Sequence, residues 1–135
     1  MLKIDPSDSV PIWKQIEEGV RHLIASGALG PGDAVASVRE LARELRVNPL
    51  TVSKAYRRLV DTEILIVRRG EGTFVAQNPP RMGARERGRK LDEAAGRYTT
   101  YARTLGADGG ETLDAVNRSW EKLTGEPPLR GGTPP

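Results

Sequence analysis

The side chains best suited to chemistry lie between Ser37 and Arg57, and their types point to recognition of nucleic acid. Cationic side chains alternate there with an amide and short hydroxyls: Ser37, Arg39, Asn48, Thr51, Ser53, Lys54 and Arg57. Arginine and lysine pair with guanine acceptors and phosphate oxygens, and the short polar side chains make single hydrogen bonds to either. Such residues act together only if helices present them on one face, so the elements around them matter.

Two helix start signals lie within this stretch. Ser37 and Glu40 form a capping box, which predicts a helix directly after Ser37. Asn48 is a preferred N-cap, and Pro49 is favoured at the first position of a helix, so a second helix begins there. Because Pro49 keeps Asn48 out of helical angles, residues 46–48 must form a turn. The pattern predicts a helix-turn-helix.

The second of these helices has distinct inner and outer faces. Its inward stripe is Val52, Ala55, Tyr56 and Leu59, and its outward positions are Leu50, Ser53, Lys54, Arg57 and Arg58. Short polar groups at the start of a helix, with basic groups behind them, suit a major groove. An ordinary helical hairpin with a solvated charged face is the alternative that this pattern leaves open.

Elements on both sides complete a small domain. Upstream, Asp8 or Ser9 is expected to cap a helix that ends at about Ser26. Downstream, two β-favouring runs, 64–67 and 73–76, predict a hairpin, because a short glycine-containing loop separates them. Three helices followed by a hairpin is the element order of a winged helix-turn-helix.

The tip of this hairpin is a second candidate for DNA contact. The loop contains Arg68, Arg69, Gly70 and Gly72. The arginines are placed to touch phosphate or to enter a minor groove, and the glycines let the backbone approach DNA closely. A tight turn with solvated arginines is the alternative.

The rest of the chain predicts a helical tail. Residues 79–90 form a basic linker, which either runs beside DNA or opens the next helix, and 91–123 predict two amphipathic helices. The Gly- and Pro-rich segment 124–135 is expected to be disordered. Two short helices bury their stripes poorly alone, so they pack on the first domain or pair with a second chain. The expected dimerisation residues are Leu91, Ala95, Tyr98, Ala102, Leu105, Leu113, Val116 and Trp120.

The predicted fold is therefore mainly α-helical with a small β-hairpin. A winged helix-turn-helix domain is expected over 9–78, with 1–8 as an N-terminal arm, followed by the two-helix dimerisation tail. Residues 1–80 carry 11 basic and 10 acidic side chains, so DNA affinity must come from clustering of basic groups on one face.

Composition also argues against catalysis. The 135 residues include no cysteine and one histidine, His22, so no metal site and no cofactor is expected. No nucleophile with an adjacent base and no phosphate-binding loop occurs in the sequence, so the protein is not expected to be an enzyme. No apolar run is long enough for a signal peptide or a membrane span, which favours a cytoplasmic location.

A series of ordered motifs makes the interpretation more specific. It includes Pro11-Ile12-Trp13-Lys14-Gln15-Ile16, Pro31-Gly32-Asp33, Ser37-Val38-Arg39-Glu40-Leu41-Ala42, Thr51-Val52-Ser53-Lys54-Ala55-Tyr56 and Gly70-Glu71-Gly72-Thr73-Phe74-Val75. With these motifs, residues 4–77 resemble the DNA-binding domain of the gluconate-repressor (GntR) family of bacterial transcription regulators, particularly its short YtrA-like branch.

The resemblance implies roles for individual residues. Arg39 resembles the arginine that reaches DNA from the first helix of the motif, and Ser37 resembles its phosphate-contacting companion. Further base and phosphate contacts are implied at the start of the recognition helix and at the wing tip: Asn48, Leu50, Thr51, Ser53, Lys54, Gly70, Gly72 and Thr73.

Four positions depart from the family pattern. Ala36 replaces a usual proline, and Arg46 adds a charge to the turn. Ile64 replaces a glycine that usually closes the recognition helix, so another residue must end it. Leu50 replaces a common asparagine and offers an apolar contact, such as one with a thymine methyl.

The sequence thus predicts a homodimeric, sequence-specific transcription regulator, most simply a repressor of a palindromic operator. The resemblance implies that the tail dimerises and that the regulated operon is adjacent and encodes a transporter. A small-molecule effector, if there is one, would sit at the dimer interface or between tail and winged domain, where Tyr98, Tyr101 and Trp120 could line a cleft. A winged-helix module that binds another protein and not DNA is the alternative.

Overall fold

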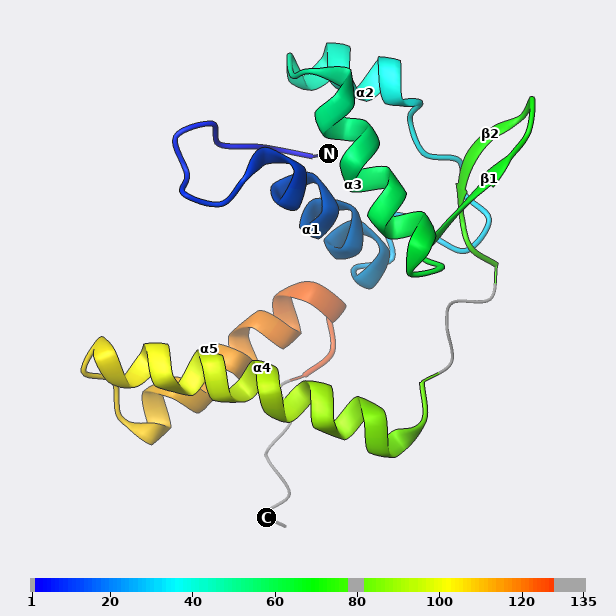
Figure 1. Cartoon of the computed structure of the whole chain (residues 1–135). Helices are drawn as coiled ribbons and strands as arrows, with labels where there is room; N and C mark the ends of the chain where they lie inside the picture. The colour runs from blue at the N-terminus through cyan, green and yellow to red at the C-terminus, as the bar shows by residue number, and fades with distance from the viewer. Residues whose placement is uncertain (1, 78–81, 128–135) are drawn as a thin grey trace. The chain divides into compact units, whose positions relative to one another are not determined.

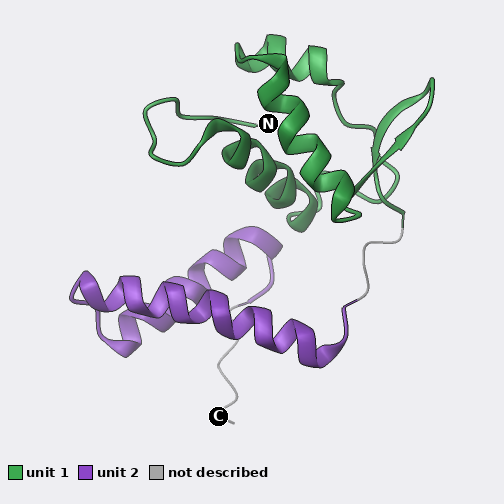
Figure 2. Cartoon of the chain, in the orientation of Figure 1, with its two compact units in different colours: residues 1–81 green, residues 82–135 purple. Residues whose placement is uncertain are grey.

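The computed structural model describes residues 2–77 and 82–127, and the chain divides into two compact units, 1–81 and 82–135 (Figures 1 and 2). Within the described residues, the first unit contains three helices and one antiparallel hairpin, and the second contains two helices. In chain order the elements are α1 (Ile12–Ala25), α2 (Val38–Leu45), α3 (Pro49–Asp61), β1 (Leu65–Arg68), β2 (Gly72–Val75), α4 (Ala84–Thr104) and α5 (Gly109–Thr124). The predicted fold class is confirmed.

The core of the first unit lies where α3 packs against both α1 and α2. The predicted inward stripe of α3 is buried, as are Ile16 and Val20 of α1 and Leu65 of β1. Each fully buried aliphatic side chain contributes about 1.5–3 kcal/mol relative to an exposed one. The amphipathic pattern therefore fixes which face of α3 is left for solvent.

The starts of α2 and α3 follow the predicted caps. Ser37 Oγ accepts from the Glu40 N–H at 3.1 Å, and Glu40 accepts from the Ser37 N–H at 3.2 Å. Asn48 Oδ1 accepts from the Leu50 N–H at 2.8 Å, and Pro49 is the first residue of α3. The helix-turn-helix prediction is thus confirmed at both start signals.

The predicted cap of α1 is wrong. Neither Asp8 nor Ser9 caps it, because the helix starts at Ile12 after Pro11, without a side-chain cap. The Gln15 side chain holds the approach to the helix instead. It accepts from the Asp5 N–H at 2.7 Å and donates to the Asp5 and Val10 carbonyls.

Two non-glycine residues end helices in the left-handed conformation. Arg46 has φ 56° after α2, and Glu63 has φ 61° after α3. In each case the next N–H bonds five residues back, from Val47 to Ala42 and from Ile64 to Leu59, as in a Schellman motif. Glu63 therefore closes the recognition helix in place of glycine, and its backbone is strained by its Cβ.

The wing strands are shifted from the predicted runs. Ile64 lies outside β1 because its N–H caps α3, so the strand begins at Leu65, which pairs with Val75. Arg68, predicted in the loop, pairs with Gly72 at the end of the ladder. A third segment joins the sheet through an isolated bridge from Ala34 to Phe74, which the sequence did not predict.

The second unit begins with the basic segment for which the sequence leaves two interpretations open. Residues 84–90 form the first two turns of α4, as the helix interpretation predicts, because most of them are strong helix formers. The second of the two predicted tail helices is capped by Asp108, which accepts from the Glu111 N–H at 2.8 Å. Residues 78–81 of the predicted linker region and 128–135 of the predicted disordered end lie outside the described residues.

No helix of the described residues is both long and apolar enough to cross a membrane.

Replacement of Glu63 by glycine should stabilise the first unit. The left-handed conformation costs an L-residue about 1–2 kcal/mol, and glycine avoids this cost. Glycine also increases the conformational entropy of the unfolded chain, which offsets part of the gain, so the free energy of unfolding should rise by about 0.5–1 kcal/mol. Urea unfolding measures this change. Glu63→Ala is the matched control, since it removes the same carboxylate without relieving the backbone. An equal gain in the free energy of unfolding for Glu63→Ala would show that removal of the carboxylate causes the effect, and would contradict the backbone strain at Glu63.

Candidate DNA interface

The outer face of the helix-turn-helix brings together most of the predicted contact residues. Arg39, Asn48, Lys54 and Arg57 are exposed, and Thr51 and Ser53 are half-buried beside them. Leu50 is 76 % exposed, and nothing in the unit covers it among the described residues. This face carries cations, an amide, hydroxyls and one apolar side chain.

The capping groups also set the charge at the helix starts. Hydrogen bonds from Ser37, from its side chain first and then its backbone, lower the pKa of the exposed Glu40 carboxyl. Glu40 therefore stays ionised at neutral pH, where a negative charge in the first turn suits the helix dipole. Ser37, the predicted phosphate contact, is exposed, and its hydroxyl is engaged with Glu40 through this capping box.

Trp13 on α1 lies under two cations of α3. Lys54 Nζ is 4.5 Å from the ring centroid and Arg58 Cζ is 4.8 Å from it. Arg58 Nε also donates to Glu17 Oε2 at 2.8 Å, and Glu17 is 8 % exposed. Arg58 is exposed as predicted, and in addition it supplies, with Arg21, a partner for the buried Glu17 carboxylate. Lys54 is exposed but its position is restrained by the ring.

A sequence signal for this cluster did exist. Trp13 and Glu17 are four residues apart on α1, and Lys54 and Arg58 are four residues apart on α3. Residues at this spacing share a helix face, so an aromatic and acidic pair can face a basic pair. The sequence does not say that these two faces meet.

Tyr56 ties the recognition helix to the segment that leads into α2. Its hydroxyl donates to the Ala36 carbonyl at 2.7 Å, while its ring is buried in the core. Burial, and then the Glu40 and Glu44 carboxylates, raise the pKa of Tyr56 to about 12. The hydroxyl therefore remains a donor at neutral pH. Sequence reasoning assigned only the apolar part of this side chain.

The two wing arginines occupy different positions. Arg68 Cζ lies 4.9 Å from the centroid of the Phe74 ring, so its guanidinium stacks along the strand. Arg69 and Gly70 form the exposed tip, where Gly70 has φ 77°. Thr73 is half-buried, and its carbonyl accepts from the Val35 N–H at 3.0 Å. Arg69 is thus the cation at the tip itself.

The predicted dimerisation residues of the second unit are mostly uncovered. Leu91, Leu105 and Leu113 are 63, 66 and 52 % exposed, and Ala102 is buried. Tyr98 Oη donates to the Thr112 carbonyl at 2.8 Å and so links α4 to α5. A groove of about 610 Å³ runs between the helices, lined in part by Tyr98, Leu113 and Val116. A hollow of about 310 Å³ is lined by Tyr98 and Trp120, among others, and Tyr101 lines neither.

Comparison with protein families gives one match within the first unit. Residues 13–75 match the bacterial regulatory proteins of the gntR family. The matched range begins at Trp13 of α1 and ends at Val75, the last residue of β2.

Two curated relatives are similar in sequence. The chain is 45 % identical over 78 residues to the HTH-type transcriptional repressor YtrA of Bacillus subtilis, a match that covers 58 % of this chain and 60 % of that protein. It is 34 % identical over 112 residues to an HTH-type transcriptional regulator of Mycobacterium tuberculosis, covering 83 % and 88 %. The first alignment thus spans less than two thirds of the YtrA relative.

Three solved structures are similar in fold. A transcriptional antiterminator from Listeria monocytogenes gives a TM-score of 0.81 at 27 % identity, covering 97 % of this chain and 98 % of the other. YtrA from Sulfolobus acidocaldarius, a GntR-family transcription factor, gives 0.57 at 40 % identity, covering 70 % and 95 %. The DNA-binding domain of AraR in complex with an operator gives 0.50 at 30 % identity, covering 56 % and 93 %.

Replacement of Trp13 by leucine should uncouple the two cations from α1. Each exposed cation–π contact contributes about 0.5–1 kcal/mol, so the free energy of unfolding should fall by about 1–2 kcal/mol. In a Lys54→Met background the fall should be about 0.5–1 kcal/mol smaller, because one contact is already gone. Chemical denaturation of the four variants gives this cycle.

Lys14→Met is the matched control for this cycle. Lys14 is exposed and adjacent to Trp13, and neighbouring residues on a helix point in different directions. Its effect should therefore add to that of Trp13→Leu. Strict additivity of Lys54→Met with Trp13→Leu would contradict the contact.

Proposed function

This chain belongs to the GntR family of bacterial regulatory proteins, and on that basis we propose that it is a sequence-specific DNA-binding transcription regulator that represses from a palindromic operator as a homodimer. The observation that carries the proposal is the exposed outer face of α2 and α3, where capped helices present Arg39, Asn48, Leu50 and Arg57 together. Its relatives in the comparisons are transcription regulators and not enzymes, which supports a role without catalysis.

The recognition helix is α3, and its first two turns enter the major groove. Helix N-termini offer free N–H groups and a positive dipole end to phosphate, which fits the Asn48–Pro49 start. Arg57 and Arg39 supply cations for phosphate or guanine, and Leu50 supplies an apolar surface for a thymine methyl. Lys54, whose ammonium group lies over the Trp13 ring, supplies a further cation from α3.

The wing adds a contact to the sugar–phosphate backbone. Arg69 at the tip is the cation placed to reach phosphate or the minor groove, and Gly70 keeps the tip backbone free of side chain. Arg68 supports the tip from the strand through Phe74. Binding of this kind takes place in the cytoplasm, where a bacterial operator lies.

The dimer forms through α4 and α5. Their apolar residues stay exposed in the isolated chain, and pairing with a second copy would remove that surface from water. A two-fold pair places two copies of α3 about one DNA turn apart, which calls for a palindromic operator. A bound operator that overlaps a promoter then blocks transcription.

The first test is preference for a natural site. Fluorescence anisotropy at physiological salt should give at least about 10³-fold tighter binding to the operator in the upstream region of its own gene than to random DNA of equal length. Arg39→Ala should weaken operator binding by about 1–3 kcal/mol if it reaches a base. Arg118→Ala, an exposed arginine of α5, is the control for lost charge. Equal affinity for both DNAs would refute the proposal.

A second test asks whether Leu50 contacts a thymine methyl. Replacing single thymines of the operator by deoxyuridine removes only that methyl. At one position the wild type should lose about 0.8 kcal/mol, the value of one buried carbon, which is about four-fold in affinity. Leu50→Ala should bind both DNAs equally there. A loss that persists in Leu50→Ala at every thymine would exclude this contact.

A third test addresses the tail. Leu113→Glu places a charge on the exposed apolar groove, so the dimer should dissociate to monomers in sedimentation equilibrium while the winged unit stays folded. Thr100→Glu adds the same charge on α4 away from the predicted stripe and should remain dimeric. A Leu113→Glu variant that remains dimeric would contradict the proposed interface.

A further inference from the structure

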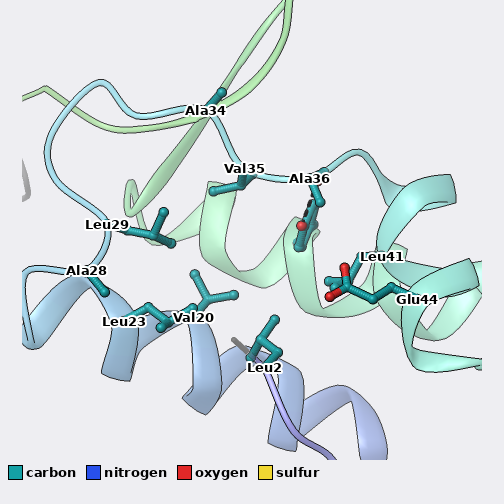
Figure 3. Close-up of a pocket in the computed structure, with 11 residues that line it drawn as sticks. Leu2, Val20, Leu23, Ala28, Leu29, Ala34, Val35, Ala36, Leu41 and Glu44 are labelled. Carbon is teal, nitrogen blue, oxygen red and sulfur yellow. Dashed lines mark hydrogen bonds between the residues drawn. The ribbon is translucent and has the colours of Figure 1, made fainter.

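The first unit contains an apolar pocket behind its DNA-facing elements. The pocket has a volume of about 250 Å³, and its lining residues come from several helices, from the segment before α2 and from the N-terminal arm (Figure 3). Its walls include Val20 of α1, Val35 and Ala36 of the segment before α2, Leu41 of α2, and Tyr56 of α3. An apolar cavity of about 150 Å³ is enough to bind benzene, so this pocket can hold a ring with a short substituent.

The polar groups of the pocket define what that substituent can be. The Tyr56 hydroxyl is already used, because it donates to the Ala36 carbonyl. Glu44 is the only charged side chain that lines the pocket, and Figure 3 shows its carboxylate near Leu41 at the α2 edge. Among the described residues, Glu44 takes part in no ion pair and no side-chain hydrogen bond. Glu44 is exposed, so its carboxylate is a solvated charge at the edge of the aliphatic walls, where it favours a cation with an apolar body over a neutral or anionic molecule.

The N-terminal arm forms the last wall. Leu2 lies over the pocket against α1, at Gly19, where a Cβ would overlap the Leu2 side chain. A larger residue at position 19 would require the Leu2 side chain to shift. The arm and the segment before α2 are the walls of the pocket that lie outside helices.

The other walls belong to the elements that present the DNA contacts. Tyr56 is in α3, and Ala36 precedes the capping residue of α2. Val35 donates to the Thr73 carbonyl of β2, so the same segment holds the wing. A ligand in the pocket therefore touches the supports of the recognition helix, the first helix of the motif and the wing at once.

We propose that this pocket binds a small apolar amine, with its cationic group at Glu44, and that occupancy changes the affinity for the operator. The regulatory part rests on the proposed function. The coupling follows from linkage: a ligand that prefers one arrangement of these walls shifts DNA binding by its differential affinity. The site lies within the winged unit and includes none of the tail aromatics expected from the sequence to line an effector cleft.

Benzylamine is the probe, with benzyl alcohol and benzoate as neutral and anionic molecules of the same body. Titrations of the full chain followed by amide NMR shifts should place benzylamine at Val20, Val35, Leu41 and Tyr56. Benzylamine should bind at least ten-fold more tightly than benzyl alcohol, and benzoate should bind weakest. Glu44→Gln should bring the amine and the alcohol to similar affinity. Glu18→Gln, an exposed glutamate of α1 outside the pocket, should keep the preference.

Operator affinity is measured separately, with and without saturating benzylamine. We expect at least a three-fold change for the wild type and none for Glu44→Gln. Equal binding of the three probes, shifts confined to the tail, or a preference that survives Glu44→Gln would overturn the pocket. Amine binding without any change in operator affinity would overturn the coupling. Loss of operator preference without amine would count against the proposed function alone, since the NMR titration needs no DNA.

Discussion

The packing of one face of α3 against α1 and α2 is the interaction on which the first unit depends. Val52 and Leu59 are fully buried in it, and Ile16 meets them from α1. Burial of this stripe leaves the opposite face of the same helix in solvent with a defined orientation. A helix of 13 residues is marginal by itself, so its rigidity comes from this contact. The orientation of the side chains on the outer face is therefore determined by buried residues on the opposite face of α3.

The two ends of α3 are held differently. Its C-terminal half is anchored by the ion pair of Arg58 with buried Glu17 and by the ring of Trp13. Its N-terminal end is held by the Asn48 cap, the turn at Arg46 and the buried Val52. Leu50 lies at the N-terminal end, and Arg57 and Arg58 lie toward the C-terminal end. This arrangement fits a helix whose N-terminal end enters a DNA groove while its C-terminal half is fixed to α1.

Sequence reasoning succeeded where the signal is local. The capping pairs, the turn and the buried stripes each depend on residues within a few positions of one another, and the element order followed from them. It failed where two elements meet: the stack of Lys54 on Trp13 and the bond from Tyr56 to Ala36 join residues that are 41 and 20 positions apart in the chain. The start of β1 was misplaced for a related reason. The Ile64 N–H serves the end of α3, and a strand pattern cannot show that competing use.

Among the described residues, large apolar side chains are exposed at Leu50, at Val67 of the wing and along α4 and α5, and a partner is proposed at the first and the last of these places. Leu50 stands alone among polar groups at the start of α3, whereas Leu105 and Leu113 belong to a stripe along α4 and α5. A single exposed leucine is common on proteins, but a stripe is not. Burial of the stripe supplies free energy for pairing of two chains, which a single methyl contact cannot do. The small contact at Leu50 is suited to discrimination between bases, and the large apolar stripe of α4 and α5 is suited to dimer assembly. Sequence specificity and dimer affinity thus depend on different exposed residues of one chain.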